Sequence, residues 1–189
     1  MAWWSWRPGG QGQADGIKSR NHGSGSTLGA LRVPDDLSTL DKFPMASRGC
    51  EPAGVTLDRI GVALDMLDIR YLSDGDGNLL AMWERHAVLF TMEGPEDEIL
   101  VIRARPHATV AFEFADRAYR AVNEWNHLHR FAKAYVGDPT LRGELPIYAE
   151  TQVPLRAGAH DALVVELVDC GAAVATAFVE WLYSEAALL

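Results

Sequence analysis

The stretch YRAVNEWNHLHRFAKAYV, residues 119–136, decides the fold, because a helical pattern gives way to a strand pattern inside it. Apolar residues up to Trp125 recur at helical spacing, with Arg120 and Glu124 between them, which predicts an amphipathic helix. The segment 131–137 then favours a strand. The stretch offers almost no catalytic chemistry. We predict a helix over about 111–128 whose buried stripe is Phe114, Ala118, Ala121, Val122 and Trp125.

The other predicted elements lie on both sides of this helix. Thr56 is a suitable N-cap for a first helix that carries apolar residues from Leu57 to Leu67 at helical spacing. The segment SDGDGN, residues 73–78, is typical of a tight turn between two strands. Strands are expected at 69–72, 79–84, 86–93 and 99–103, and again at 131–137 and 145–155.

A long apolar helix is expected to close the chain, from Asp161 as N-cap to Ser184. Its predicted main stripe is Leu163, Leu167, Cys170, Val174, Phe178 and Trp181. Further apolar residues lie beside that stripe, so the helix is either sandwiched within its own chain or buried against another subunit. A twofold homodimer is the commonest closed solution, and we expect one.

The order of these elements predicts the fold class. A helix, three or four strands, a helix, two strands and a last helix indicate an α+β layer, in which helices pack against one antiparallel sheet. Residues 51–189 are expected to form this domain, and residues 1–50 a flexible tail, because residues 9–29 hold few large apolar side chains. Trp3, Trp4 and Trp6 then form either a docking tip or a poorly constrained terminus.

Charge and cysteine content exclude some classes of function. The chain carries a formal charge of -9, and residues 51–189 alone carry 22 acidic and 11 basic side chains. Because a surface this acidic repels phosphate backbones, we expect no nucleic-acid partner. Cys50 and Cys170 form neither a disulfide framework nor a metal-binding CxxC spacing. With no secretory signal and no run of eighteen apolar residues, a soluble, cytoplasmic protein without a membrane partner is expected.

An ordered series of short motifs resembles the YbjN-domain family, particularly its actinobacterial members. The series comprises YLSDGDG at 71–77, Trp83, VNEWN at 122–126 with Arg130, KAYV at 133–136, YAE at 148–150, and LRAG at 155–158 before DAL at 161–163. Phe131-Ala132 stands where a Trp-Pro pair is expected. The resemblance implies an αβββαββα fold like that of type III secretion chaperones, which usually dimerise and bind extended client segments. It also implies a sensory or stress-response regulator.

Two possible metal or catalytic signals have simpler interpretations. Asp74-Gly-Asp-Gly-Asn78 begins like a calcium loop, but Leu79 and Arg85 stand where such a loop needs glycine and a bidentate carboxylate, so a hairpin turn is favoured. His127 and His129 lack a third ligand at suitable spacing and suit the C-terminal end of a helix. No nucleophile motif or phosphate-binding loop is present, so we expect no enzyme, no metal and no cofactor.

Polar and aromatic residues near the key stretch are the remaining candidates for binding. Asn123 and Asn126 either bind the backbone of an extended guest or satisfy carbonyl groups after the helix, and the second role is favoured. Arg130 and Lys133 either clamp an anion or pair with Glu124 or Glu150. The predicted site for a client or ligand, which includes two tryptophans, is Trp83, Asn123, Trp125, Asn126, Arg130 and Lys133.

Two functional hypotheses follow. The first is a non-enzymatic, chaperone-like adaptor or stress and sensory regulator that binds a protein client. The second is a small-ligand sensor or an undetected enzyme, in which Asn126, Arg130, Lys133 and Glu150 converge on a polar pocket. A thermal-shift screen separates them, because a ligand at a hundred times its dissociation constant stabilises the fold by about 2.7 kcal/mol.

Overall fold

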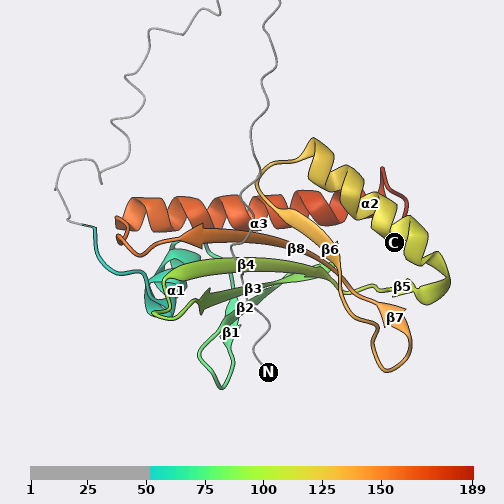
Figure 1. Cartoon of the computed structure of the whole chain (residues 1–189). Helices are drawn as coiled ribbons and strands as arrows, with labels where there is room; N and C mark the ends of the chain where they lie inside the picture. Colours follow the sequence, from blue (N-terminus) through green and yellow to red (C-terminus); the bar gives the residue numbers. More distant parts are fainter. Residues whose placement is uncertain (1–51) are drawn as a thin grey trace, which may run out of the picture. The chain divides into compact units, whose positions relative to one another are not determined.

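The computed structural model describes residues 52–189 (Figure 1). The predicted tail, with Trp3, Trp4, Trp6 and Cys50, lies outside the described residues. The elements in chain order are α1 (Leu57–Met66), β1 (Tyr71–Ser73), β2 (Leu79–Met82), β3 (His86–Glu93), β4 (Ile99–Pro106), β5 (Val110–Ala111), a 3-10 turn (Phe112–Phe114), α2 (Ala115–Leu128), β6 (Lys133–Val136), β7 (Glu144–Leu145), β8 (Ile147–Pro154) and α3 (Asp161–Tyr183).

One antiparallel sheet organises these elements. Six strands follow the order β1-β2-β3-β4-β8-β6, and each pairs antiparallel with its neighbours. The predicted α+β class is therefore confirmed, with four strands before α2 and two after it. Strands β5 and β7 form a separate pair of two residues each, which the sequence pattern did not predict. The expected strand at 69–72 begins later, at Tyr71, and the strand expected at 131–137 is reduced to β6.

Helix α1 begins as predicted. The Thr56 hydroxyl oxygen accepts a hydrogen bond from the Arg59 N–H at 3.4 Å, which satisfies a donor that the helix leaves unpaired. Ile60 and Leu64 are fully buried, so this helix covers the sheet. Gly61 lets it approach closely, because a Cβ there would lie 2.9 Å from the Tyr71 hydroxyl oxygen.

The Arg59 guanidinium joins the beginning of the domain to the beginning of α3. Nη1 donates to the carbonyl oxygens of Ala53 and Gly54, both at 2.8 Å. Nη2 donates to the Ala159 carbonyl oxygen at 2.8 Å and to Asp161 Oδ1 at 2.6 Å. Asp161 thus pairs with Arg59. The predicted N-cap at Asp161 is wrong, because Asp161 is the first helical residue and His160 is the N-cap.

The turn between β1 and β2 is built around one carboxylate. Asp74 Oδ1 accepts from the N–H groups of Asp76 and Asn78 at 2.9 and 2.8 Å, and Oδ2 accepts from Asn78 Nδ2 at 2.9 Å. The hydrogen bond from the Asn78 side chain is the main reason that the pKa of Asp74 is lowered. Gly77 supplies the left-handed backbone at φ 85°. The preferred interpretation of this segment, a hairpin turn, is confirmed.

Helix α2 buries most of its predicted stripe. Ala118, Ala121, Val122 and Trp125 are buried, but Phe114 is 51% exposed. The prediction for Phe114 is wrong because residues 112–114 form a 3-10 turn, whose three-residue period does not continue the α-helical face.

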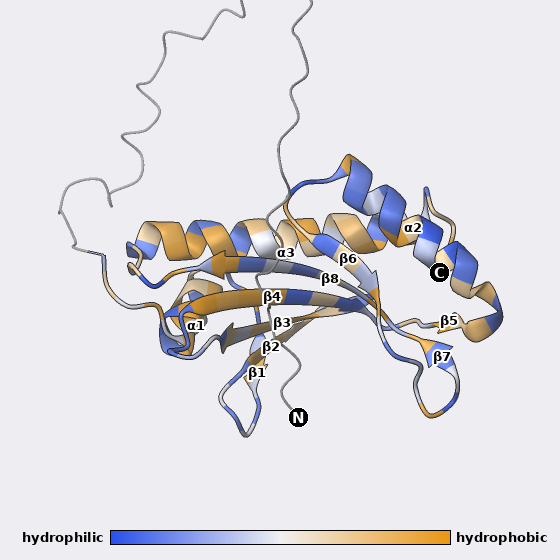
Figure 2. Cartoon of the chain, viewed as in Figure 1, coloured by the Kyte–Doolittle hydropathy of each residue, from blue (hydrophilic) through white to orange (hydrophobic). Residues whose placement is uncertain are grey.

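Helix α3 lies on the sheet through a stripe that shares Phe178 and Trp181 with the predicted one but otherwise differs from it. The buried residues are Val164, Val168, Gly171, Ala172, Ala175, Phe178, Val179, Trp181 and Leu182, whereas Leu163 is exposed and Leu167, Cys170 and Val174 are partly buried. Figure 2 shows α3 hydrophobic along most of its length, so apolar periodicity alone does not single out one face. Backbone approach decides instead, because a Cβ at Gly171 would lie 2.6 Å from Ile102 Cδ1.

The core lies between the sheet and all three helices. Trp125 of α2 packs against Phe178 edge-to-face with ring centroids 4.9 Å apart, and against Trp181 at 5.6 Å. The apolar cluster continues through Phe90 and Ile147 on the helix-covered side of the sheet. By length and composition α3 is also able to cross a membrane, a property that apolar core helices share.

Candidate functional site

The sheet has one face that the helices leave uncovered. Side chains alternate across a strand, so Leu100, Ile102 and Ala104 of β4 point to the core, and Arg103 and Arg105 point away from it. We call this side the open face. Its members, which follow from the strand registers, include Leu72, Leu80, Met82, Ala87, Leu89, Arg103, Arg105, Lys133, Tyr135, Tyr148, Glu150 and Gln152.

One row of paired residues, which runs across all six strands, shows that the open face has an apolar half and a polar half. Leu72 pairs with Leu80 and Leu80 with Leu89, which gives an apolar half on β1, β2 and β3. Leu89 pairs with Arg103, and beyond Arg103 the row continues through two polar residues, Glu150 and Lys133. Leu72 is 65% exposed, and Met82, in the adjacent row, is 58% exposed. Exposed apolar side chains of this size, gathered on one sheet face, are typical of a binding surface.

A carboxylate organises the polar half. Arg103 Nε donates to Glu150 Oε2 at 2.5 Å, and the Tyr135 hydroxyl donates to the same oxygen at 3.1 Å. Gln152 Nε2 donates to Glu150 Oε1 at 2.6 Å. Arg103 Nη2 also lies 3.4 Å from Glu93 Oε1. Each hydrogen-bond partner of Glu150 within residues 52–189 is a donor, so the cluster holds this carboxylate ionised and fixed in position.

Two pKa values record this arrangement. Burial would raise the pKa of Glu150, but hydrogen bonds from Gln152, Arg103 and Tyr135, together with the charge of Arg103, outweigh it and leave the pKa lowered. Burial and the nearby charge of Glu150 raise the pKa of Tyr135 to about 12. Tyr135 is therefore a neutral hydrogen-bond donor at neutral pH.

Aromatic rings extend the polar half. Tyr135 and Tyr148 stack with centroids 5.3 Å apart, and the Arg105 guanidinium lies 6.0 Å from the Tyr148 ring centroid. Beside them a hollow of about 340 Å³ is lined by Phe131, Lys133, Tyr135, Glu150 and Gln152. Planar rings next to paired charges can hold a peptide by stacking and by hydrogen bonds.

Two of the predicted site residues maintain the fold. Trp125 is buried, and its Nε1 donates to the Ala132 carbonyl oxygen at 3.2 Å. Asn126 Oδ1 accepts from the Ala134 N–H at 2.8 Å, and its Nδ2 donates to the Ala134 carbonyl oxygen at 2.9 Å. Asn126 thus occupies the outer hydrogen-bonding groups of β6, the edge strand, as another strand would.

The other predicted residues do not form a single site. Asn123 and Arg130 are exposed, and Lys133 lies on the open face beside Glu150. The proposed polar pocket is thus brought together only in part, because Lys133 and Glu150 line one hollow whereas Asn126 and Arg130 do not line it. Which of these residues bind a partner stays a prediction.

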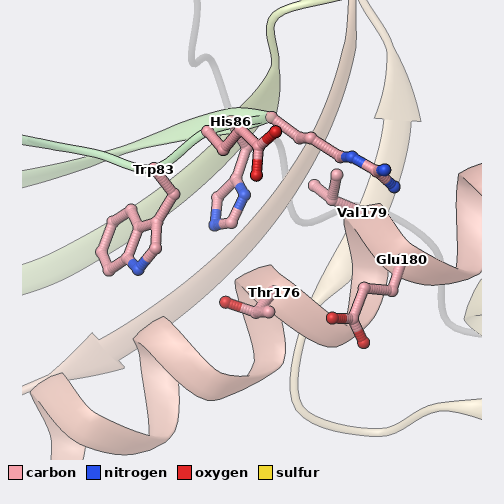
Figure 3. A pocket seen from close by; sticks show the side chains of 7 residues that line it. Trp83, His86, Thr176, Val179 and Glu180 are labelled. Carbon is pink, nitrogen blue, oxygen red and sulfur yellow. The ribbon is translucent and has the colours of Figure 1, made fainter.

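Trp83 lies just after β2, at the end of the sheet where β3 begins. Its indole stacks on the imidazole of His86 with centroids 5.0 Å apart and planes 2° apart, and both rings face α3 (Figure 3). The His107 side chain fixes this corner, since its Nε2 lies 3.0 Å from the Trp83 carbonyl oxygen.

Sequence reasoning did not identify Arg103 or Tyr135 as members of a site. The available signal was alternation. Arg103 and Arg105 alternate with apolar residues of one strand, and Lys133 and Tyr135 alternate with Ala134 in another. Alternation identifies an outward residue, but only the register shows that Arg103 faces Glu150, 47 residues later. Among residues 52–189, no group of three or more His, Cys, Asp or Glu side chains is suited to a metal ion.

Comparison with known proteins supports the family and the fold. The family model described as "Putative bacterial sensory transduction regulator", YbjN, matches residues 56–184. No curated protein is significantly similar to the chain in sequence. A crystal structure of YbjN from E. coli, described as "a putative transcription regulator", superposes with a TM-score of 0.59 at 13% identity, over 71% of this chain and 96% of that one. At this identity the likeness is one of fold.

Proposed function

Because the chain belongs to the YbjN family, we propose that it is a non-enzymatic regulator whose open face binds an extended segment of a protein client. The observation that carries this proposal is the uncovered sheet face, where exposed Leu72 and Met82 share one surface with the Arg103–Glu150 cluster. Such a surface offers apolar contact area and fixed hydrogen-bonding groups side by side, which is how extended peptides are held. The mode of action is chaperone-like.

The face is a better binding surface than either edge of the sheet. At β6 the Asn126 side chain occupies the N–H and C=O of Ala134, so a client strand cannot add there without displacing it. At the other edge β1 is only three residues long. Strand addition needs a row of unpaired backbone groups, which neither edge supplies over a useful length. A client therefore binds through side-chain contacts across the strands.

Affinity purification from the native cell extract, followed by mass spectrometry, tests this proposal when it compares matched variants. Leu72→Asp and Met82→Asp place a charge in the apolar half, and Leu141→Asp places the same charge on a fully exposed loop residue. We expect the wild type and Leu141→Asp to retain one common set of proteins that both open-face variants lose. Recovery of the same set by all four proteins would contradict binding at the open face.

We also propose that the protein forms a homodimer through α1 and the first turns of α3. Val62 and Met66 of α1 are each 59% exposed, and Leu163 of α3 is exposed near them in the fold. The two helices enclose a groove of about 430 Å³ with a mostly apolar lining that includes Val62, Met66 and Val165. A second copy covers such a surface without using the open face.

Sedimentation equilibrium at micromolar concentration tests the dimer separately from client binding. We expect the wild type and Leu72→Asp to sediment as dimers, and Met66→Asp to sediment as a monomer with unchanged circular dichroism. A strictly monomeric wild type would remove the dimer and leave the client proposal standing.

A further inference from the structure

A cavity at the end of the sheet contains the most unusual polar side chain of the domain. It lies between the segment that joins β2 to β3 and the C-terminal half of α3, and its volume is about 380 Å³ (Figure 3). Cavities of this size hold small molecules. Its walls come from Trp83, Glu84, Arg85 and His86 on one side and from Thr176, Val179 and Glu180 on the other. These residues are separate from the open face.

His86 is 3% exposed, and it is the one buried polar or charged side chain among the described residues. Its Nε2 has no hydrogen-bond partner within residues 52–189. Buried ring nitrogens almost always form a hydrogen bond, so this unpaired nitrogen indicates that a hydrogen-bonding partner is missing. Burial, helped by the charge of nearby His107, lowers the pKa of His86, which keeps the imidazole neutral, and a neutral ring whose proton is on Nδ1 accepts a hydrogen bond at Nε2.

The other polar groups of the cavity also accept hydrogen bonds. The Thr176 hydroxyl donates its hydrogen bond to the Ala172 carbonyl oxygen at 3.0 Å, so its oxygen lone pairs can accept one from a ligand. Glu84 and Glu180 are exposed carboxylates, and neither forms an ion pair within the described part of the chain. The one cation of the wall, Arg85, lies over the Tyr183 ring at 5.0 Å from its centroid. The wall therefore holds two carboxylates and two further acceptors against two donor groups, the Arg85 guanidinium and the Trp83 N–H, and it carries a net negative charge.

From this inventory we propose that the cavity binds a small molecule that carries a protonated amine. An ammonium group supplies several N–H donors and the positive charge that two carboxylates require. The Trp83 indole adds a surface that attracts cations. The net charge of -9 further draws cations to the protein. This ligand site goes beyond client binding and does not depend on it.

Binding requires a small change in the wall. His86 Nε2 is closed to solvent, and the Trp83 indole stacks on the same imidazole, so the two rings must shift together for a ligand N–H to reach that nitrogen. A shift of this kind alters the surroundings of Trp83, which gives the experiment an optical readout in tryptophan fluorescence.

Titration of the full chain with butylamine and 1,4-diaminobutane, at constant ionic strength, tests the proposal. Butanol and butyrate serve as neutral and anionic probes of similar size. We expect saturable fluorescence changes and a raised melting temperature with the amines alone. A response to butyrate or butanol equal to that of the amines, or the absence of any saturable response, would overturn the assignment.

Matched variants separate the cavity from general attraction to an acidic protein. Glu180→Gln removes a wall carboxylate, and Glu166→Gln removes the same charge from an exposed position of α3 outside the cavity. We expect amine affinity to fall about tenfold in Glu180→Gln, as for loss of a charge-assisted hydrogen bond, and to stay unchanged in Glu166→Gln. Equal affinities in both variants would refute the site. His86→Phe, which keeps a ring in the stack, should also lose binding, and if it fails to fold Glu180→Gln decides.

Discussion

The two faces of the sheet are built from the same strands and follow opposite rules. On the covered face, Ile102, Ala104 and Ala149 are small or apolar, because helices press on them and leave no space for water. One residue away along β4, Arg103 meets Glu150 and Tyr135 in a cluster that reaches solvent. The difference teaches that packing limits the choice of residue much more strictly on the covered face, since on β4 only Val101 of the other face is fully buried.

The largest contrast between the faces should be found by truncating one large side chain on each. Phe178→Ala removes a fully buried ring that packs on Trp125, and we expect it to lower the free energy of unfolding by about 3–5 kcal/mol. Leu72→Ala on the open face should change it by no more than about 0.5 kcal/mol. Urea denaturation followed by circular dichroism measures both. Similar losses would mean that the open face is covered in solution.

A second contrast concerns how closely α3 lies on the covered face. Gly171→Val should lower the free energy of unfolding by about 1–3 kcal/mol, because its side chain would overlap that of Ile102. Ala173→Val, at an exposed position of the same helix, should cost about 0.5 kcal/mol through helix propensity alone. In a double-mutant cycle with Ile102→Ala, the combined loss should be smaller than the sum of the single losses. Strict additivity would show that Gly171 and Ile102 do not limit the approach.

The edge of the sheet offers a third comparison, between two asparagines of one helix. Asn126→Ala leaves both backbone groups of Ala134 without their side-chain partner and should cost about 1–2 kcal/mol in thermal or urea unfolding. Asn123→Ala, at an exposed position, should stay within about 0.5 kcal/mol. Light scattering should also reveal more association for Asn126→Ala, since the β6 edge becomes available. Equal stability and equal scattering would assign Asn126 another role.

The smallest expected effect concerns the open face itself and depends on pH. The pKa of Glu150 is lower in the folded than in the unfolded chain, so its ionised form favours folding above the ordinary value of 4.5, and this contribution is lost as the pH falls through the folded pKa. Glu150→Gln should therefore lower the free energy of unfolding at pH 7 by less than about 1 kcal/mol, since solvent screens the cluster.

Urea titrations at pH 7, 5 and 3 follow the difference between the wild type and Glu150→Gln, which should shrink toward pH 3. Glu96→Gln is the matched control, because Glu96 pairs with Arg156 at a position where both side chains are mostly exposed. Its difference from the wild type should be small at each pH, because solvent screens an exposed pair. A gap for Glu150→Gln that widens on acidification would reverse the sign of this argument.

Local signals predicted the elements well where they involved neighbouring residues. Thr56 caps its helix, the turn around Asp74 forms a hairpin, and β3 has the predicted bounds of 86–93. Each depends on chemistry within a few residues, such as a hydroxyl that accepts an N–H or a glycine that adopts positive φ. The predicted burial of Phe114 was wrong because a 3-10 turn changes the helical period just before α2.

Features that depend on distant contacts could not be predicted. The buried stripe of α3 is decided by the approach of Gly171 to Ile102, and the pattern of a helix that is apolar on more than one face does not record that contact. The site shows the same limit. The favoured interpretation of Asn126, as a partner for backbone groups, agrees with its bonds to Ala134, but Arg103 and Glu150 come together only through the strand register. His86 alternates in phase with buried Val88 and Phe90, but only the packing of α3 shows that its Nε2 is buried without a partner.

The Arg59 clasp has a consequence for how the protein can be handled and how evolution can extend it. One guanidinium donates hydrogen bonds to the carbonyl oxygens of Ala53 and Gly54, to the carbonyl oxygen of Ala159 and to the carboxylate of Asp161. The first residues of the domain are therefore held against the start of α3. Tags, fluorescent fusions or exchanged leaders joined before Pro52 should therefore leave the folded body undisturbed, whereas Arg59→Ala should make its melting temperature sensitive to whatever is attached.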